Sequence, residues 1–220
     1  MKKVNNGLQN KRKSGVLLHV SSLPGRFSIG SFGDEARRFV DFLSEAGFGL
    51  WQVLPFAPAD ECNSPYKSYA AFGGNPYFID LPSLYERGLL TAAELRDAEQ
   101  KTPWKCEYER LSRERLPLLR RAAERVGDRS PVLALMEKIP ALGRASHFNA
   151  LREANGGLPH YEWTVEECDP ETLFFYQFLE YEFYTQWQSL REYASSRGVQ
   201  VIGDMPIYVA LDSCEVRSSP

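Results

Sequence analysis

Cysteine and histidine are scarce in this chain, and their scarcity narrows the chemistry it can carry out. Its 220 residues include four cysteines and three histidines. The cysteines are widely separated and form no CxxC pair: Cys62, Cys106, Cys168 and Cys214. A zinc knuckle or a dithiol redox motif needs such pairs, so we expect no metal site. A reducing, cytoplasmic setting is the simplest interpretation.

Long hydrophobic runs and an excess of one charge are also missing. No window approaches the ~20 apolar residues of a transmembrane helix, and the net charge is only −3. We therefore expect neither a membrane nor a nucleic acid as partner. The basic leader "MKKVNNGLQNKRKSG" is followed only by "VLLHV", which is shorter than the ~7–15 apolar residues of a signal peptide. Residues 1–14 are predicted to be a flexible, solvated leader.

Several motifs that mark nucleotide-binding or hydrolytic sites are absent too. The sequence has no GxGxxG, Walker A, GxSxG or HExxH pattern, and no cofactor is expected. One alternative is a cysteine-dependent enzyme in which Cys62 is the nucleophile and His19 its base. The other is that Cys62 is a bystander.

What the chain does contain is an alternation of apolar strands and helices. An apolar run at 15–20, an amphipathic helix at 34–46 and a second run at 49–56 predict a βαβ unit with parallel strands. A long helix from Asp169 to Gly198 then feeds a third strand. The order indicates an α/β fold whose short apolar strands are covered on both faces.

Residues 83–154 are predicted to be a helical insertion between the second and third strands. Thr91 and Glu94 form a capping-box signal at the start of one helix. Four prolines are expected to separate several short helices: Pro103, Pro117, Pro131 and Pro140.

The segment "NSPYKSYAAFGGNPYFIDL", residues 63–81, is long for a connection between a strand and a helix. Loops of this length are usually functional or disordered, and its five aromatic residues argue against disorder. Aromatic rings suit the apolar faces of sugars, and the nearby polar groups suit sugar hydroxyls. The alternative is a lid whose rings only pack over the fold.

Polar residues follow the predicted strands, at the edge where α/β folds collect their ligands. Asp204 follows the third strand, and His19 follows the first. An acid at a strand end either takes part in a site or caps its own loop, and the residues alone leave both open.

Several motifs together resemble the 4-α-glucanotransferases, the amylomaltase or disproportionating enzyme family of the α-amylase clan. The similarity is carried by "GVLLHVSSLPGRFSIGSFGDEARRFVDFL", "LWQVLPFAP", the 63–81 segment, "GGLPHYEW", "FYQFLEYEFYTQW" and "VIGDMPIYVALDSCEV". These motifs follow one another in the family's order from about Lys13 to Pro220.

The resemblance implies a (β/α)8 TIM barrel of which this chain would supply the first three strands, an incomplete barrel. Residues 15–82 would begin the barrel and carry the aromatic substrate loop. Residues 83–168 would form the inserted helical subdomain, and residues 169–220 the next barrel helix and the third strand.

The resemblance also implies a reaction. The family cuts an α-1,4-glucan and passes the segment to the 4-hydroxyl of another glucan, with retention. A carboxylate nucleophile and a carboxylic acid about 5 Å apart perform such chemistry. The expected partners are α-1,4-glucans, namely maltooligosaccharides and amylose. The family's essential carboxylates lie on later strands, so no residue here is given a catalytic role, and this N-terminal fragment is expected to be inactive alone.

Four residues are carried over as substrate-binding. Tyr66 matches the "SPY" tyrosine that faces sugar, and Asp204 matches the acid at the end of the third strand, which would orient neighbours or sugar hydroxyls. Ser64 and Asn75 match the same loop motif and are expected to shape it.

The chain departs from the family pattern in three places. "GDSPY" has Asn63 instead of its acid, "LEDYALF" appears as "LGRASHF" with Gly143 and Arg144 in place of two acids, and Arg217 replaces the tryptophan after "DSAEV". Drift, a changed contact or a relaxed constraint in a non-working copy would explain each. The alternative to a transferase is a non-catalytic glucan-binding module, a function that the aromatic loop would support unaided.

Overall fold

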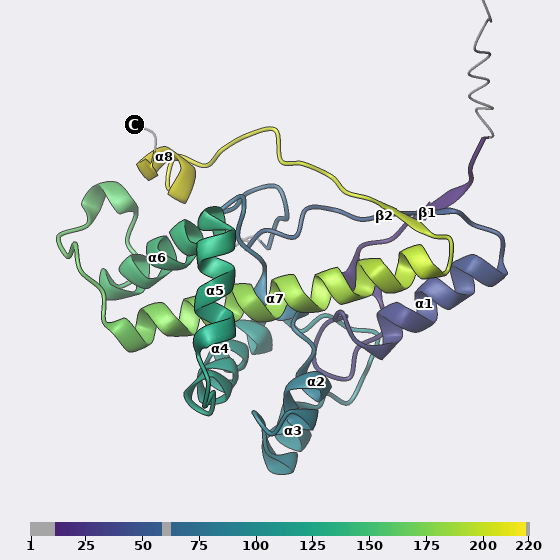
Figure 1. Ribbon diagram of the computed structural model, residues 1–220, viewed down its shortest axis with the longest axis horizontal. Coiled ribbons are helices and arrows are strands. Elements are labelled where there is room, and N and C mark those ends of the chain that lie inside the picture. The colour runs from purple at the N-terminus through teal and green to yellow at the C-terminus, as the bar shows by residue number, and fades with distance from the viewer. Residues whose placement is uncertain (1–11, 59–62, 219–220) are drawn as a thin grey trace, which may run out of the picture.

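A three-stranded parallel sheet lies at one end of the molecule in the computed structural model, which describes residues 12–58 and 63–218 (Figure 1). The strands are β1 (Gly15–Leu17), β2 (Leu50–Gln52) and β3 (Gln200–Ile202), in the order β1-β2-β3. Trp51 pairs with Val16 on one side and Val201 on the other. The predicted parallel pairing is confirmed.

Helix α1 (Asp34–Glu45) connects β1 to β2, and helix α7 (Pro170–Ser196) leads into β3. The Asp169 side chain accepts a hydrogen bond from the Thr172 backbone amide at the start of α7, as the sequence predicts for an N-cap. Gly198 has a φ of +76° just beyond the helix, a conformation that glycine adopts without a steric penalty.

Helices α1 and α7 cover one face of the sheet. Trp51 is fully buried there, against Val40 and Leu43 of α1 and Leu190 of α7. The expectation that the strands are covered on both faces is wrong for the two edge strands. Leu17 is 58% exposed and Ile202 is 41% exposed, because no described element packs on their side of the sheet.

The connection between the second and third strands is helical. Its helices are α2 (Leu81–Glu86), α3 (Ala92–Ala98), α4 (Tyr108–Glu124), α5 (Ser130–Lys138) and α6 (Pro140–Ala154). Single 3-10 turns lie at Val20–Ser22, Pro76–Phe78 and His160–Glu162. The capping box of Thr91 and Glu94 is present at the start of α3.

Pro117 lies inside α4, so the prediction that it separates two helices is wrong. A proline inside a helix costs about 3 kcal/mol because it removes a donor and crowds the preceding turn. The buried face of α4, which includes Leu111, Leu118 and Leu119, offsets that cost by packing against α7 and its neighbours. Pro131 and Pro140 occupy the first turns of α5 and α6, as expected.

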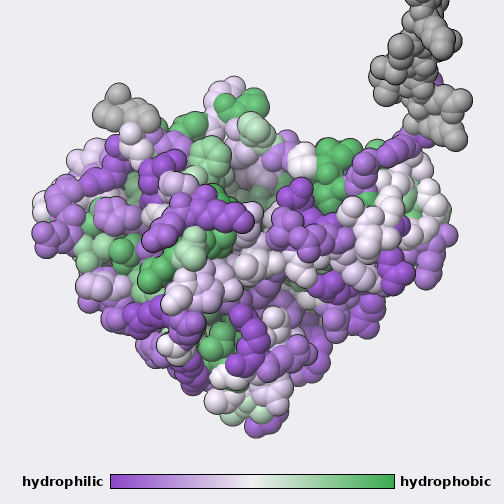
Figure 2. All heavy atoms as spheres, in the orientation of Figure 1, coloured by the Kyte–Doolittle hydropathy of each residue, from purple (hydrophilic) through white to green (hydrophobic). Residues whose placement is uncertain are grey.

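Beyond β3 the chain crosses the molecule to the short helix α8 (Cys214–Ser218), which lies beside α6 (Figure 1). This crossing segment, residues 203–213, is rich in exposed apolar side chains: Met205, Ile207, Tyr208, Val209 and Leu211. Figure 2 shows apolar surface along the same edge of the molecule. No helix in the described part of the chain is long and apolar enough to span a membrane.

Candidate functional site

The aromatic loop, residues 63–80, connects β2 to α2 and is ordered by contacts along its whole length. We call residues 63–72 its front half and residues 73–80 its rear half. The two halves are held by different parts of the molecule, and the predicted site residues are divided between them.

The structure brings Tyr66 and Asp204 together, although 138 positions separate them in sequence. The Tyr66 hydroxyl donates a hydrogen bond of 2.8 Å to Oδ2 of Asp204. This hydrogen bond raises the pKa of Tyr66, because the carboxylate stabilises the protonated phenol. The Tyr66 side chain is 46% exposed, so a ligand can reach it.

Asp204 also accepts a hydrogen bond of 2.8 Å from the Met205 backbone amide, through Oδ1. One carboxylate therefore both shapes its own loop and positions the tyrosine. The sequence left open whether Asp204 takes part in a site or caps its own loop, and these two hydrogen bonds are compatible with both roles.

Ser64 and Asn75 are placed where they shape the loop. Ser64 Oγ accepts a hydrogen bond from the Tyr66 backbone amide at 3.4 Å. Asn75 is buried. Its side-chain Oδ1 accepts a hydrogen bond from the Tyr77 backbone amide at 3.0 Å, while its backbone amide donates to the Phe56 carbonyl at 2.8 Å. A contact of either side chain with sugar stays a prediction.

The rear half is anchored by ionisable side chains buried among the helices. Glu180 of α7 accepts a 2.9 Å hydrogen bond from the Gly74 amide, and burial raises the pKa of this carboxyl to about 8. Arg115 of α4 donates to the Ile79 carbonyl at 3.2 Å. Asp80 accepts from Ser31 at 2.7 Å, and burial raises its pKa.

The front half is held by the chain that follows β3. The Cys214 amide donates to the Tyr69 carbonyl at 2.7 Å, and the Ala71 amide donates to Oε1 of Glu215 at 2.9 Å. The guanidinium of Arg152, from α6, lies 3.7 Å from the centre of the Tyr69 ring. The chain after β3 and helix α6 thus both hold the front half of the loop in place.

His19 is buried in an aromatic cluster at the end of β1. Its ring lies 5.0 Å from that of Phe56 and 5.2 Å from that of Phe78. Nδ1 accepts a hydrogen bond from the Leu54 amide at 3.2 Å, and burial lowers the pKa of His19 to about 4. This histidine is neutral at pH 7. Cys62, its proposed partner, lies outside the described residues, as does most of the predicted leader, residues 1–11.

Two of the departures from the family pattern can be related to local features of the structure. Asn63 has a φ of +54°, a left-handed conformation that asparagine tolerates better than most residues. Arg217 lies 4.5 Å from the centre of the Trp163 ring and pairs with Glu166. Nothing in the structure explains Gly143.

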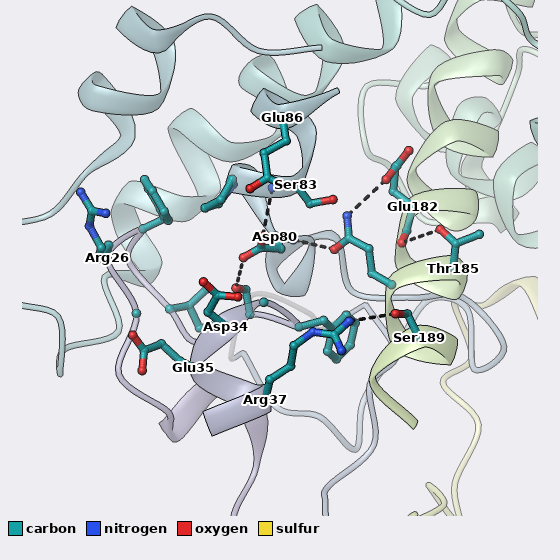
Figure 3. Close-up of a pocket in the computed structure, with 18 of the residues that line it drawn as sticks. Arg26, Asp34, Glu35, Arg37, Asp80, Ser83, Glu86, Glu182, Thr185 and Ser189 are labelled. Carbon is teal, nitrogen blue, oxygen red and sulfur yellow. Dashed lines mark hydrogen bonds between the residues drawn. The ribbon is translucent and has the colours of Figure 1, made fainter. Parts of the chain in front are cut away.

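A cavity of about 510 Å³ lies between the start of α1, α2 and α7 (Figure 3). Asp34 and Glu35 project from α1 toward it, and Glu182 and Ser189 come from α7. Neither Tyr66 nor Asp204 lines this cavity. In the ranges 12–58 and 63–218, no cluster of three or more His, Cys, Asp or Glu residues is arranged to hold a metal.

Comparison with known proteins identifies the family. A family profile described as 4-alpha-glucanotransferase matches residues 18–220. A 4-alpha-glucanotransferase of Streptococcus pneumoniae is 36% identical, covering 96% of this chain and 45% of that protein. The enzyme of Thermus thermophilus is 37% identical, covering 95% of this chain and 45% of that protein. The chain therefore belongs to the 4-alpha-glucanotransferase family.

The solved structures agree. Amylomaltase from Streptococcus agalactiae, determined in complex with acarbose, matches with a TM-score of 0.85 at 33% identity, over 96% of this chain and 46% of that one. Amylomaltase from Corynebacterium glutamicum shares the fold at a TM-score of 0.75 and 17% identity. The chain spans about half the length of the relatives it matches.

Proposed function

We propose that this chain forms the glucan-binding N-terminal part of a retaining 4-α-glucanotransferase. The hydrogen bond between Tyr66 and Asp204 is the observation that carries this proposal. It joins the tip of an aromatic loop to a carboxylate at a strand end, where α/β folds bind their ligands. A half-exposed ring beside an acid suits the alternating apolar and hydroxyl surface of a glucan.

In this proposal, the two carboxylates that cut and transfer the glucan come from strands beyond the three described. The exposed face of the sheet, with Leu17 and Ile202, and the apolar crossing segment are where the rest of a (β/α)8 barrel would pack. An unpaired strand edge promotes association between chains. We therefore expect the isolated chain to bind glucan without transferring it, and to aggregate readily.

Glucan binding is tested by electrophoresis of the purified chain through a native gel containing amylose. The wild-type chain should be retarded, whereas Tyr66→Ala should migrate almost as it does without amylose. Tyr85→Ala is the matched control, because Tyr85 is an exposed tyrosine on α2, outside the aromatic loop. Equal retardation of wild type and Tyr66→Ala would refute the proposal.

Transfer is tested separately, with maltotriose as the only substrate. Production of glucose and longer maltooligosaccharides by the 220-residue chain itself would show that the catalytic carboxylates lie within it. Binding without such products is the result we expect.

A further inference from the structure

A smaller cavity, of about 350 Å³, lies where α8 meets the front half of the aromatic loop and the start of α6. Its lining residues are Phe72, Ala141, Arg144, Cys214, Glu215 and Ser218. We infer that this cavity is a second carbohydrate site, which binds one glucosyl unit of an α-glucan. The inference rests on the proposed glucan binding, but it concerns residues other than Tyr66 and Asp204.

Phe72 supplies the apolar platform of this site. Its side chain is 67% exposed, although the neighbouring Ala70 is buried. Burying a phenylalanine side chain stabilises a protein, and this ring forgoes most of that gain. A flat aromatic face left open beside a cavity suits the apolar face of a pyranose ring.

Glu215 supplies an acceptor. Its Oε1 is committed to the Ala71 amide, which fixes the carboxylate at the cavity wall. Its Oε2 is buried and has no hydrogen-bond partner in the part of the chain that the structure describes. Buried polar atoms are nearly always paired, so an orphaned oxygen beside a cavity indicates a missing donor. A sugar hydroxyl is such a donor.

Arg144 supplies donors from the α6 side of the cavity. It makes no hydrogen bond or ion pair with the described residues, so its guanidinium is available to a ligand. A hydroxyl group can accept from a guanidinium and donate to a carboxylate at the same time. An anion would be repelled by Glu215 and a cation by Arg144, so the pair favours a neutral, polyhydroxylated ligand.

The size of the cavity limits the ligand further. Small-molecule sites span about 300–1,000 Å³, and this cavity lies near the lower end of that range. It fits a single sugar unit better than a long segment. The larger cavity beside α1 is less suited, because its Arg26, Arg38 and Arg87 side chains already pair with Glu99, Glu35 and Glu182.

Arg144 is also one of the positions at which this chain departs from the pattern it resembles, which has an acid there. An acid opposite Glu215 would lack the donors that a sugar hydroxyl needs and would repel the carboxylate. The site is therefore expected to be a property of this chain and of relatives that share the arginine.

The test is isothermal titration calorimetry with maltose, performed on the purified wild-type chain and on the Phe72→Ala and Arg144→Ala variants. Each variant should weaken binding by about two- to tenfold, the effect of losing one packing or hydrogen-bonding partner of a ligand. Phe42→Ala and Arg113→Ala are the controls, because both residues are exposed and neither lines the cavity. Both control variants should bind maltose as the wild-type chain does.

Each outcome separates this inference from the proposed function. Weakening by Tyr66→Ala, with no effect of Phe72→Ala or Arg144→Ala, would overturn the second site and leave the proposed function standing. The reverse pattern would support the second site and count against the role of Tyr66. A wild-type chain that binds no maltose and is not retarded by amylose would overturn both. Because Phe72 and Arg144 hold no other described element in place, their loss should not disturb folding, which circular dichroism checks.

Discussion

The two halves of the aromatic loop are fixed by opposite means. The rear half, residues 73–80, is tied to the helices by buried ionisable groups, chiefly Glu180 and Arg115. The front half, residues 63–72, is held at the surface by Asp204 and Glu215, which follow β3. The rear half therefore depends on the core, and the front half on the crossing segment and α8.

Because of this difference, we expect the rear half to matter chiefly for the stability of the fold and the front half for ligand recognition. Changes in the rear half should destabilise the whole fold, because its partners belong to α4 and α7. Changes in the front half should alter how the rings are presented to a ligand and leave the fold intact. The predictions below follow that division, from the largest expected effect on stability to the smallest.

Gly74→Ala should produce the largest loss of stability. A Cβ at this position would lie 2.2 Å from Cγ of Phe183 and 2.4 Å from Cδ1, so the loop or the ring must move. Overpacking of this kind costs about 1–3 kcal/mol, and we expect a value near the upper end in urea denaturation. Gly203→Ala is the matched control in the crossing segment, with no atom within 4 Å of the added carbon. It should change the free energy of unfolding by less than about 0.5 kcal/mol.

Glu180→Leu should cause the next largest decrease in the free energy of unfolding, measured at pH 5. The Gly74 amide would lose its acceptor in a buried place, which costs about 1–3 kcal/mol. Glu180→Gln keeps an acceptor oxygen and should remain close to wild type at that pH. Equal stability of the leucine and glutamine variants would show that the hydrogen bond to Gly74 does not anchor the loop.

The same glutamate gives the fold a pH dependence. Its pKa is about 8 in the folded chain, raised from an ordinary value of 4.5 by burial. The folded state therefore keeps a proton that the unfolded state releases. The stability that this group contributes is present below its ordinary pKa and is lost as the pH rises toward 8.

Glu180→Gln should remove that loss, so its free energy of unfolding should exceed that of the wild type by more at pH 8 than at pH 5. Urea denaturation at the two pH values measures the difference. A constant difference between the two proteins would contradict the raised pKa.

Tyr66→Phe should have the smallest effect on stability and a clear effect on binding. It removes the hydroxyl that Asp204 accepts from and keeps the ring. We expect an unchanged melting temperature, with weaker retardation by amylose than the wild type shows. A drop in melting temperature comparable to that of Gly74→Ala would erase the distinction between the two halves.

Local signals in the sequence predicted much of the fold. The capping box at Thr91, the N-cap at Asp169 and the glycine beyond α7 act within a few residues, and each is where it was expected. The prediction that Pro117 separates two helices was wrong, because the packing of α4 that offsets the cost of this proline depends on distant helices.

The sequence motifs proposed two members of the candidate site, but not the contacts that connect them. Tyr66 and Asp204 were chosen from motifs, and only the fold shows that their side chains touch. Glu180 was missed, because a glutamate is rarely fully buried and one in a long helix is first taken as exposed. Its setting among aromatic residues in "FYQFLEYEFYTQW" is the signal that would have indicated burial. The contacts of Cys214 and Glu215 with the loop span more than 140 positions and leave no local pattern.

The most direct test of this account is a titration of the ¹⁵N-labelled chain with maltoheptaose, followed through the backbone amide resonances. The account predicts that amides of residues 64–72 and 203–206 shift on addition of the sugar, while those of residues 74–80 stay in place. Shifts confined to the rear half, or the absence of any shift at saturating sugar, would contradict the claim that the front half is the glucan-binding surface.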